Sequence, residues 1–327
     1  MKFPTMKMKR AIRKVARALG VGRIFLELRH LYSLGVLNRL LIELAKRRWL
    51  PRIESLPPLL MDQAGIEVHM LLYHKRFHEG LLAFYTFAHH AQSPVNLIAH
   101  DDGSLLSEDI RLLQTLYPGC TLIARDQADR EVGSALARRG LENCIRLRKQ
   151  FVLALKLLDV SFYAKSREFI FLDSDTLFFE RPTELIEGLA SEKFYLGSTP
   201  LFSVDVASAY TIGKDEFTQL IGCDCVQRCN TGIFRSAPIS LDVVEDFLKC
   251  GAFWNGALPK DWYVEQTIYA MIFTLAGAKA LPGTYAISPS NVATAKFVSG
   301  HFCGSPDFSA KPYYCQAIPF LISKLQP

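Results

Sequence analysis

Hydrophobic and polar positions alternate with two different periods along this chain. In residues 6–50, apolar side chains recur at helical spacing among basic ones, with a break near Gly20-Val21-Gly22, which predicts two helical segments. Three prolines between positions 51 and 58 then interrupt the pattern. We therefore expect a basic amphipathic helical arm over residues 1–55 and a main domain over residues 60–327.

Beyond residue 60, short apolar runs alternate with amphipathic stretches. This pattern predicts strands at residues 65–73, 95–103, 121–126 and 167–175, and helices at residues 81–91, 107–117 and 150–163. Strands that alternate with helices indicate βαβ units, and hence an α/β fold with a largely parallel central sheet. Ligands of such folds gather at the carboxyl ends of the strands.

The charge is unevenly distributed. Through Arg52 the chain carries fourteen Lys and Arg against two acidic residues, a net charge of +12, whereas the remainder has a net charge of −6. Such asymmetry is typical of a segment that meets anionic surfaces. No nucleic-acid-binding motif accompanies it, so we expect no nucleic acid, and residues 1–52 indicate either an anionic membrane surface or a helix packed on the main domain with a solvated basic face.

The chain contains no apolar run of the length that a membrane span needs, and charges interrupt every candidate signal segment. Its eight cysteines, without a signal, favour reduced thiols and a cytoplasmic protein, peripheral on the inner face of the membrane if the arm binds lipid. Cys223, Cys225 and Cys229 form a cluster that lacks paired C-x-x-C spacing and a nearby fourth ligand. We expect buried thiols there rather than a zinc site.

Two carboxylates follow the most apolar strand. Asp173 and Asp175 flank Ser174 in the segment FIFLDSDTLFF, where the alternation of an extended chain places both carboxylates toward one side. Neighbouring carboxylates repel unless a positive charge lies between them, and a divalent cation is the usual partner. The alternative is that the pair caps the following turn through Asx-type hydrogen bonds.

Two later segments carry further polar candidates. Asn230 and Gly232 lie in a strand-like context, where a glycine permits close approach of the backbone to a ligand; an ordinary turn is the alternative. Glu265 and Gln266 lie on a predicted helix beside aromatic residues, and a solvated helix start is the alternative there.

The C-terminal region supplies His301, Gly304 and Lys311, although a lone histidine is more often a core or surface residue than a ligand. Tyr73 and His74 end the first predicted strand, either as contacts for a nucleotide or simply as a polar loop end.

Taken in order, these segments resemble the family 8 glycosyltransferases, the group that includes glycogenin and bacterial galactosyltransferases. The family pattern is a hydrophobic strand ending in D-x-D, then N-[AS]-G, then D-Q on a helix, and then H-F-x-G-x-x-K-P. The matching residues are Asp173 and Asp175, Asn230-Thr231-Gly232, Glu265-Gln266, His301-Phe302-Cys303-Gly304 and Lys311-Pro312, with Lys156 as a basic residue on the preceding helix. The resemblance covers residues 66–315.

The resemblance implies a GT-A type, Rossmann-like, mostly parallel sheet flanked by helices, here with an N-terminal basic helical extension. It implies a retaining glycosyltransferase with a nucleotide-sugar donor, UDP-linked, and a glycan, lipid or protein acceptor. Asp173, Asp175 and His301 would hold Mn²⁺ or Mg²⁺, and this donor set suits Mn²⁺ better. The roles implied for the other residues are contacts to the reacting sugar for Glu265 and Gln266, phosphate neutralisation for Lys311, and donor binding for the rest: Lys156, Ser174, Asn230, Gly232 and Gly304.

This chain departs from the family pattern at several positions. Thr231 replaces a smaller residue, Glu265 stands where the family has Asp, and more residues than usual separate His301 from Lys311. The long gap between Asp175 and Asn230 indicates an insertion that shapes an acceptor pocket.

Two other classes of protein stay open at this point. A haloacid dehalogenase-type phosphotransferase also ends an apolar strand with D-x-D, but it expects Thr or Val where this chain has Leu177, and it carries the strand near the start of the domain. A non-catalytic binding module on a sugar-nucleotide fold is the second alternative, although it would not need the full set of metal ligands.

Overall fold

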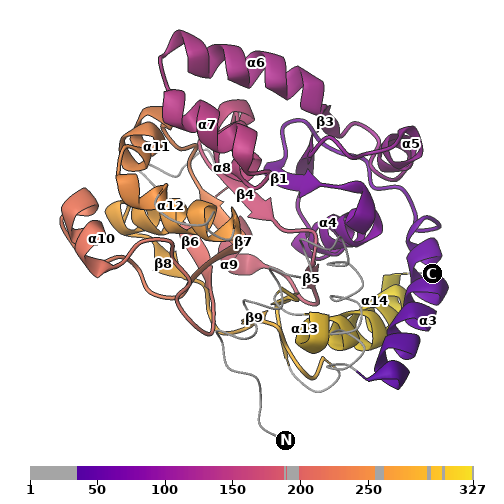
Figure 1. Cartoon of the computed structure of the whole chain (residues 1–327). Helices are drawn as coiled ribbons and strands as arrows, with labels where there is room; N and C mark the ends of the chain where they lie inside the picture. Colours follow the sequence, from indigo (N-terminus) through magenta and orange to yellow (C-terminus); the bar gives the residue numbers. More distant parts are fainter. Residues whose placement is uncertain are drawn as a thin grey trace, which may run out of the picture.

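A computed structural model describes residues 35–187, 189, 199–254, 261–292, 296–303 and 306–325. Residues 1–34 of the predicted arm, and Gly304, lie outside the described residues. The described part contains a seven-stranded sheet of order β3-β2-β1-β4-β7-β6-β8 (Figure 1). Its strands are β1 (Ile66–Leu72), β2 (Val95–Asp101), β3 (Thr121–Ile123), β4 (Phe169–Leu172), β6 (Leu201–Val204), β7 (Cys229–Ser236) and β8 (Lys279–Ala280).

This central sheet is mostly parallel, which confirms the predicted α/β fold class. β1 pairs in parallel with β2 and with β4, and β2 pairs in parallel with β3. β7 is antiparallel to both β4 and β6, while β6 and β8 are parallel to each other. Among the described strands of the sheet, β7 alone therefore runs in the reverse direction.

A smaller sheet lies beside the carboxyl end of β4. It has the order β5-β10-β9, and its strands are β5 (Thr176–Phe178), β9 (Tyr285–Ile287) and β10 (Ser299–His301). β10 is antiparallel to β5 and parallel to β9. Because β5 begins directly after the acidic pair, this sheet brings the C-terminal part of the chain to the edge where ligands of parallel α/β folds bind.

Helices cover both faces of the central sheet, as alternation along β4 requires. Ile170 and Leu172 point into a core on one face of the sheet, whereas Phe169 and Phe171 point into a second core on the other face. The first face carries α3 (Val36–Ile53), α4 (Phe77–Ala91), α5 (Ser107–Leu116), the π-helical turn η3 (Tyr313–Ala317) and α14 (Ile318–Leu325). The second carries α6 (Arg125–Arg138), α7 (Glu142–Gln150), α8 (Ala154–Tyr163), α10 (Lys214–Ile221), α11 (Leu241–Leu248) and α12 (Asp261–Leu275).

The remaining described helices are short: η1 (His74–Arg76), α9 (Thr183–Ile186), η2 (Gly251–Phe253) and α13 (Pro306–Pro312). α3 occupies the second half of the predicted arm, and it runs through Pro51 to Ile53 where the sequence predicted an interruption. Pro51 has no N–H to donate to the carbonyl four residues before it, so one intrahelical hydrogen bond is absent in the last turn of α3. No helix in the described ranges is long and apolar enough to cross a membrane.

A hydrogen-bonded chain of buried side chains crosses β1 and β2. The carboxylate of Glu67 accepts hydrogen bonds from the backbone N–H groups of Lys165 and Ser166, and its Oε1 lies 2.7 Å from His69 Nε2. His69 Nδ1 lies 2.8 Å from His100 Nε2, while the Nδ1 of His100 is buried without a partner. Since the Glu67 carboxylate can only accept, His69 donates its Nε2–H to Glu67, and His100 donates its Nε2–H to His69 Nδ1. Each ring then carries one N–H, and both rings are neutral.

We predict that this pair makes the protein lose stability as the pH falls below about 6.5. Burial lowers the pKa of His69 and lowers the pKa of His100 further, so the unfolded chain binds protons that the folded chain does not. Each histidine then costs about 1.4 kcal/mol per pH unit until the pH reaches its folded pKa. Urea unfolding at several pH values measures this slope. The slope should flatten in His100→Asn; equal slopes in the wild-type protein and this variant would contradict the assignment.

Candidate metal and donor-binding site

The acidic pair lies in a tight turn between β4 and β5. The N–H and the hydroxyl of Thr176 both donate to the backbone carbonyl of Asp173, at 3.2 and 2.8 Å. The turn is therefore closed by a backbone oxygen and a threonine, so the carboxylates of Asp173 and Asp175 are not what caps it. Their partners come instead from other parts of the chain, which disfavours the Asx-turn alternative.

His301 reaches this turn because β10 pairs with β5. The register places His301 opposite Thr176, and the N–H of Phe302 donates to the carbonyl of Asp175 at 2.9 Å. As a result, His301 Nε2 lies 3.1 Å from Asp175 Oδ1 and 3.6 Å from Asp173 Oδ2. Within the described part of the chain, these three residues form the single group whose ligand atoms lie close enough to share a metal ion, all within 4.8 Å of one another.

Asn230 contacts the imidazole of His301 on the side of the ring that faces away from the carboxylates. His301 Nδ1 lies 2.9 Å from Asn230 Oδ1, and the same oxygen accepts the N–H of Gly232 at 2.9 Å. An oxygen that accepts a backbone N–H is an acceptor for the ring as well, so Nδ1 carries a proton and Nε2 faces the carboxylates. Burial acts to lower the pKa of His301, but Cys303 and Asp175 raise it well above its usual range, so Nε2 is protonated as well and donates to Asp175 when no metal is bound. Asp205 Oδ2, 3.2 Å from Asn230 Nδ2, fixes the orientation of that amide.

Gly232 makes room for the ring. Its carbonyl accepts the N–H of Asp173 at 2.8 Å, which ties β7 to the acidic turn. A Cβ added at Gly232 would lie 2.0 Å from His301 Cε1 and 2.6 Å from Nε2, far inside van der Waals contact. The predicted close approach at this glycine is therefore present, and it is an approach of the backbone to a ligand residue, within a strand rather than a turn.

Two cations flank the carboxylates. Lys156 Nζ lies 3.1 Å from Asp173 Oδ1, and Arg76 NH1 lies 3.1 Å from Asp175 Oδ2. Burial acts to raise the pKa of Asp175, but His301 and Arg76 outweigh it and lower that pKa to about 2. Burial acts to lower the pKa of Lys156, but Asp173 and Glu265 raise it, so the ammonium stays charged. Asp175 is thus held ionised beside Asp173, in a position to bind a cation.

Solved structures share this arrangement of elements. The galactosyltransferase LgtC, in complex with donor and acceptor sugar analogs, aligns over 80% of this chain and 97% of its own, at 14% identity and a TM-score of 0.50. An active-site mutant of LgtC aligns over the same shares at 14% identity and a TM-score of 0.51. The apo bifunctional glycosyltransferase WbbM aligns over 83% of this chain at 14% identity and a TM-score of 0.49, and this chain spans about half of it, 53%. No family model and no curated protein matches the chain.

This chain has the GT-A glycosyltransferase fold. Within this GT-A fold, Asp173 and Asp175 lie at the carboxyl end of β4, where the parallel half of the sheet meets the antiparallel strand β7. Two carboxylates and one imidazole, whose Nε2 would release its proton when a metal binds, form a donor set that fits a divalent cation. Its fit is reinforced by the protonated Nδ1 of His301, the usual state of a ligand histidine held by an outer partner.

Glu265 and Gln266 lie on α12, which the GT-A fold packs against β7. Both side chains are buried. Glu265 Oε2 accepts the hydroxyl of Thr231 at 3.0 Å, and Oε1 lies 3.6 Å from Lys156 Nζ. Burial raises the pKa of Glu265 to about 7, although Lys156 opposes the shift. Gln266 donates to the carbonyl of Ala209 at 3.0 Å, and contact of either residue with a reacting sugar stays a prediction.

The remaining predicted residues lie at different distances from the acidic pair. Ser174 is buried between the two aspartates. Tyr73 follows β1 directly, and the ring of His74 bonds to Asp109 at 2.7 Å. Lys311 is exposed on α13 and, in the described part of the chain, makes no ion pair with either aspartate. Its contact with a phosphate therefore stays a prediction, as does a role for Gly304.

Sequence reasoning missed Arg76 and Asp205. Arg76 follows the end of β1 by four residues and therefore lies at the same edge of the GT-A sheet. Its place in the sequence, just after Tyr73 and His74, could have indicated this. Asp205 directly follows β6, the strand beside β7, and this neighbourhood could not be read from the chain. The prediction of buried thiols in the cysteine cluster is confirmed for Cys225 and Cys229 and is wrong for Cys223, which is exposed.

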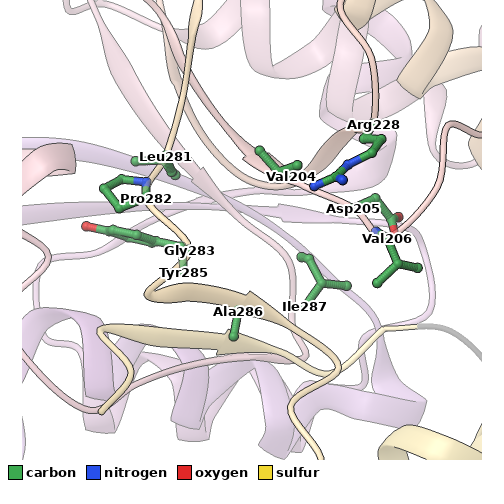
Figure 2. A pocket seen from close by; sticks show the side chains of 10 residues that line it. All are labelled: Val204, Asp205, Val206, Arg228, Leu281, Pro282, Gly283, Tyr285, Ala286 and Ile287. Atoms are coloured by element: carbon green, nitrogen blue, oxygen red, sulfur yellow. Dashed lines mark hydrogen bonds between the residues drawn. The ribbon is translucent and has the colours of Figure 1, made fainter. Parts of the chain in front are cut away.

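A pocket of about 530 Å³ opens beside the site (Figure 2). Asp205 and Arg228 lie side by side in its wall, and Asp205 is the residue that holds Asn230. The rest of the lining is mainly apolar and comes from the end of β6, the β8–β9 connection and β9 itself: Val204, Val206, Leu281, Pro282, Gly283, Tyr285, Ala286 and Ile287. The pocket thus shares a wall with the residues that orient His301.

Proposed function

We propose that this protein is a metal-dependent glycosyltransferase that uses a nucleotide-diphosphate sugar as donor. The observation that carries the proposal is the convergence of Asp173, Asp175 and His301 from two different sheets at the carboxyl edge of a GT-A fold. The outer contacts of these residues support it, because Asn230 accepts the Nδ1–H of His301 and Gly232 leaves space for its ring.

The residues around the acidic pair suit transfer from a diphosphate. When bound, a divalent cation would stabilise the negative charge that develops on the leaving diphosphate. Asp173, Asp175 and His301 would hold it. Arg76, which lies against Asp175 on the partly exposed side, is placed to meet a phosphate group, whereas Lys156 is buried and holds Asp173 in position. Lys311 is proposed as a second phosphate contact, on the family resemblance alone.

The donor is proposed to be a UDP-sugar and the reaction to retain the anomeric configuration, both from the family resemblance. The acceptor, a glycan or lipid, is proposed to enter the pocket beside Asp205. Val204, Asp205, Val206 and Arg228 of that pocket belong to the long segment between Asp175 and Asn230, as the predicted acceptor insertion requires. The mixed lining of apolar walls with a few polar groups is typical of small-molecule sites.

A thermal-shift screen of UDP-sugars tests this proposal. Ligand at one hundred times its Kd stabilises the folded state by about 2.7 kcal/mol, which should raise the apparent Tm by several degrees. We expect the rise when Mn²⁺ and a UDP-sugar are present together, and little change with UDP-sugar and EDTA. ADP- and GDP-sugars with Mn²⁺ serve as controls. If no nucleotide sugar gives a metal-dependent rise, the proposal is wrong.

A further inference from the structure

Helix α3 is attached to the domain by one face. Ile42 and Ile53 on that face are buried in the core shared with α14, and Lys46 Nζ lies 4.8 Å from the ring centre of Tyr314 in η3. In Figure 1, α3 lies along the edge of the molecule beside α14. Its position is therefore fixed, and the opposite face of the helix is presented to solvent.

That opposite face begins with four leucines. Leu37, Leu40, Leu41 and Leu44 are 69%, 54%, 42% and 52% exposed, and their spacing places them on one side of two successive turns. α3 is thus apolar on both faces, unlike a helix whose outer face is solvated. An exposed apolar row of this kind marks a surface that another phase or molecule covers.

Arginines continue the same face toward the C-terminus of α3. Arg47, Arg48 and Arg52 are exposed, and the guanidinium groups of Arg48 and Arg52 lie 4.8 and 4.9 Å from the ring centre of Trp49. The acid of this helix, Glu43, is paired with Lys46 at 3.1 Å. Among the residues that the structure describes, Arg47, Arg48 and Arg52 form no ion pair, so the leucine row ends in positive charge, in a segment that carries +12 through Arg52.

We propose that the exposed face of α3 docks on a membrane surface that contains anionic lipids. The leucines enter the boundary between headgroups and acyl chains, and the arginines pair with lipid phosphates, which is how basic amphipathic helices lie in a membrane interface. Nucleic acid would satisfy the arginines and leave the leucines in water. A second copy of the chain would bring two strongly positive segments together. A membrane accounts for both halves of the face.

Sedimentation of the full-length protein with vesicles tests the proposal. We expect binding to vesicles of phosphatidylcholine with 30% phosphatidylglycerol, and at least tenfold weaker binding to phosphatidylcholine alone. The double variant Leu40→Ser, Leu44→Ser should weaken binding to the anionic vesicles about tenfold or more. Arg47→Ala, Arg48→Ala should weaken it by a similar factor, since each basic residue near such a surface contributes about fivefold. The matched control is Leu106→Ser with Arg130→Ala, an exposed leucine before α5 and an exposed arginine in α6.

Three results would overturn the proposal. The first is equal binding to neutral and anionic vesicles, and the second is unchanged binding by both α3 variants. The third is a wild-type dimer in sedimentation velocity that both leucine substitutions dissociate, without any vesicle binding, because the leucines would then cover a second copy. All substituted side chains are at the surface, and circular dichroism of each variant verifies that its fold is retained.

Discussion

Asp175→Asn is expected to reduce metal-dependent release of nucleotide from the UDP-sugar donor at least about 100-fold. Asparagine keeps the size of the side chain but removes the charge that faces both His301 and Arg76, at 3.1 Å each. A bound metal is worth several kcal/mol to such a transition state, and each 1.36 kcal/mol is a factor of ten in rate. Released UDP, measured at saturating Mn²⁺, reports the effect.

The control for Asp175→Asn is Asp126→Asn. Asp126 lies on the exposed outer side of α6 and pairs with Arg130 at 3.0 Å, so its loss should leave turnover unchanged. Circular dichroism of both variants verifies that the fold is intact. If Asp175→Asn retained wild-type turnover with its fold intact, the assignment of this carboxylate to the metal would be refuted.

Gly232→Ala is expected to lower metal affinity by about 10- to 100-fold, the usual cost of disturbing an outer contact of a metal ligand. The new methyl group would lie 2.0 Å from His301 Cε1, so the ring must move away from the lone-pair direction that Asn230 sets. The crowding should also cost about 1–3 kcal/mol of stability. Isothermal titration with Mn²⁺ measures the affinity, and urea unfolding in EDTA measures the stability.

Gly133→Ala is the matched control for Gly232→Ala. Gly133 lies inside α6, where an added Cβ meets nothing within 4 Å. Alanine there should stabilise the protein by up to about 1 kcal/mol, because glycine is a poor helix residue, and should leave Mn²⁺ affinity unchanged. Unaltered affinity in Gly232→Ala would show that His301 does not depend on the space at this glycine.

The fold could be predicted where burial imposes a clear period on the chain. β4 is apolar and buried at all four residues, so it reads as a continuous apolar run. β1 and β2 are mostly apolar and pair over their full length, although Glu67, His69 and His100 interrupt their apolar runs. α6 and α7 went unpredicted because few of their residues are apolar: in α6, Ala128, Val132 and Leu136 are the buried positions. Their spacing of four residues is typical of a helix, but three buried apolar positions in fourteen residues are too few to predict one.

The residue types of the candidate site could be predicted from the order of motifs, but their geometry could not. His301 meets Asp175 because of the pairing of β10 with β5, a contact between segments more than 120 residues apart. The contact of Asp205 with Asn230 likewise depends on β6 lying beside β7. Such long-range pairing is not encoded in local periodicity, and this is why Asp205 was found only in the structure.

Lys156 and Glu265 show a further limit of reading roles from motif positions. Both match the family pattern, yet the structure buries both, with Lys156 against Asp173 and Glu265 bonded to Thr231. Their shared contact at 3.6 Å links α8 to α12 beneath the acidic pair. The sequence indicated which residues belong to the site, whereas the depth of each residue depends on the packing of helices from distant parts of the chain.

Electron paramagnetic resonance of Mn²⁺ tests the central claim most directly, because it counts free metal in the presence of the protein. With UDP present, the wild-type protein should remove about one Mn²⁺ per chain from solution, and Asp175→Asn should remove far less at the same concentrations. Equal binding by the two proteins, or no binding by the wild-type protein, would contradict a metal site at Asp173, Asp175 and His301.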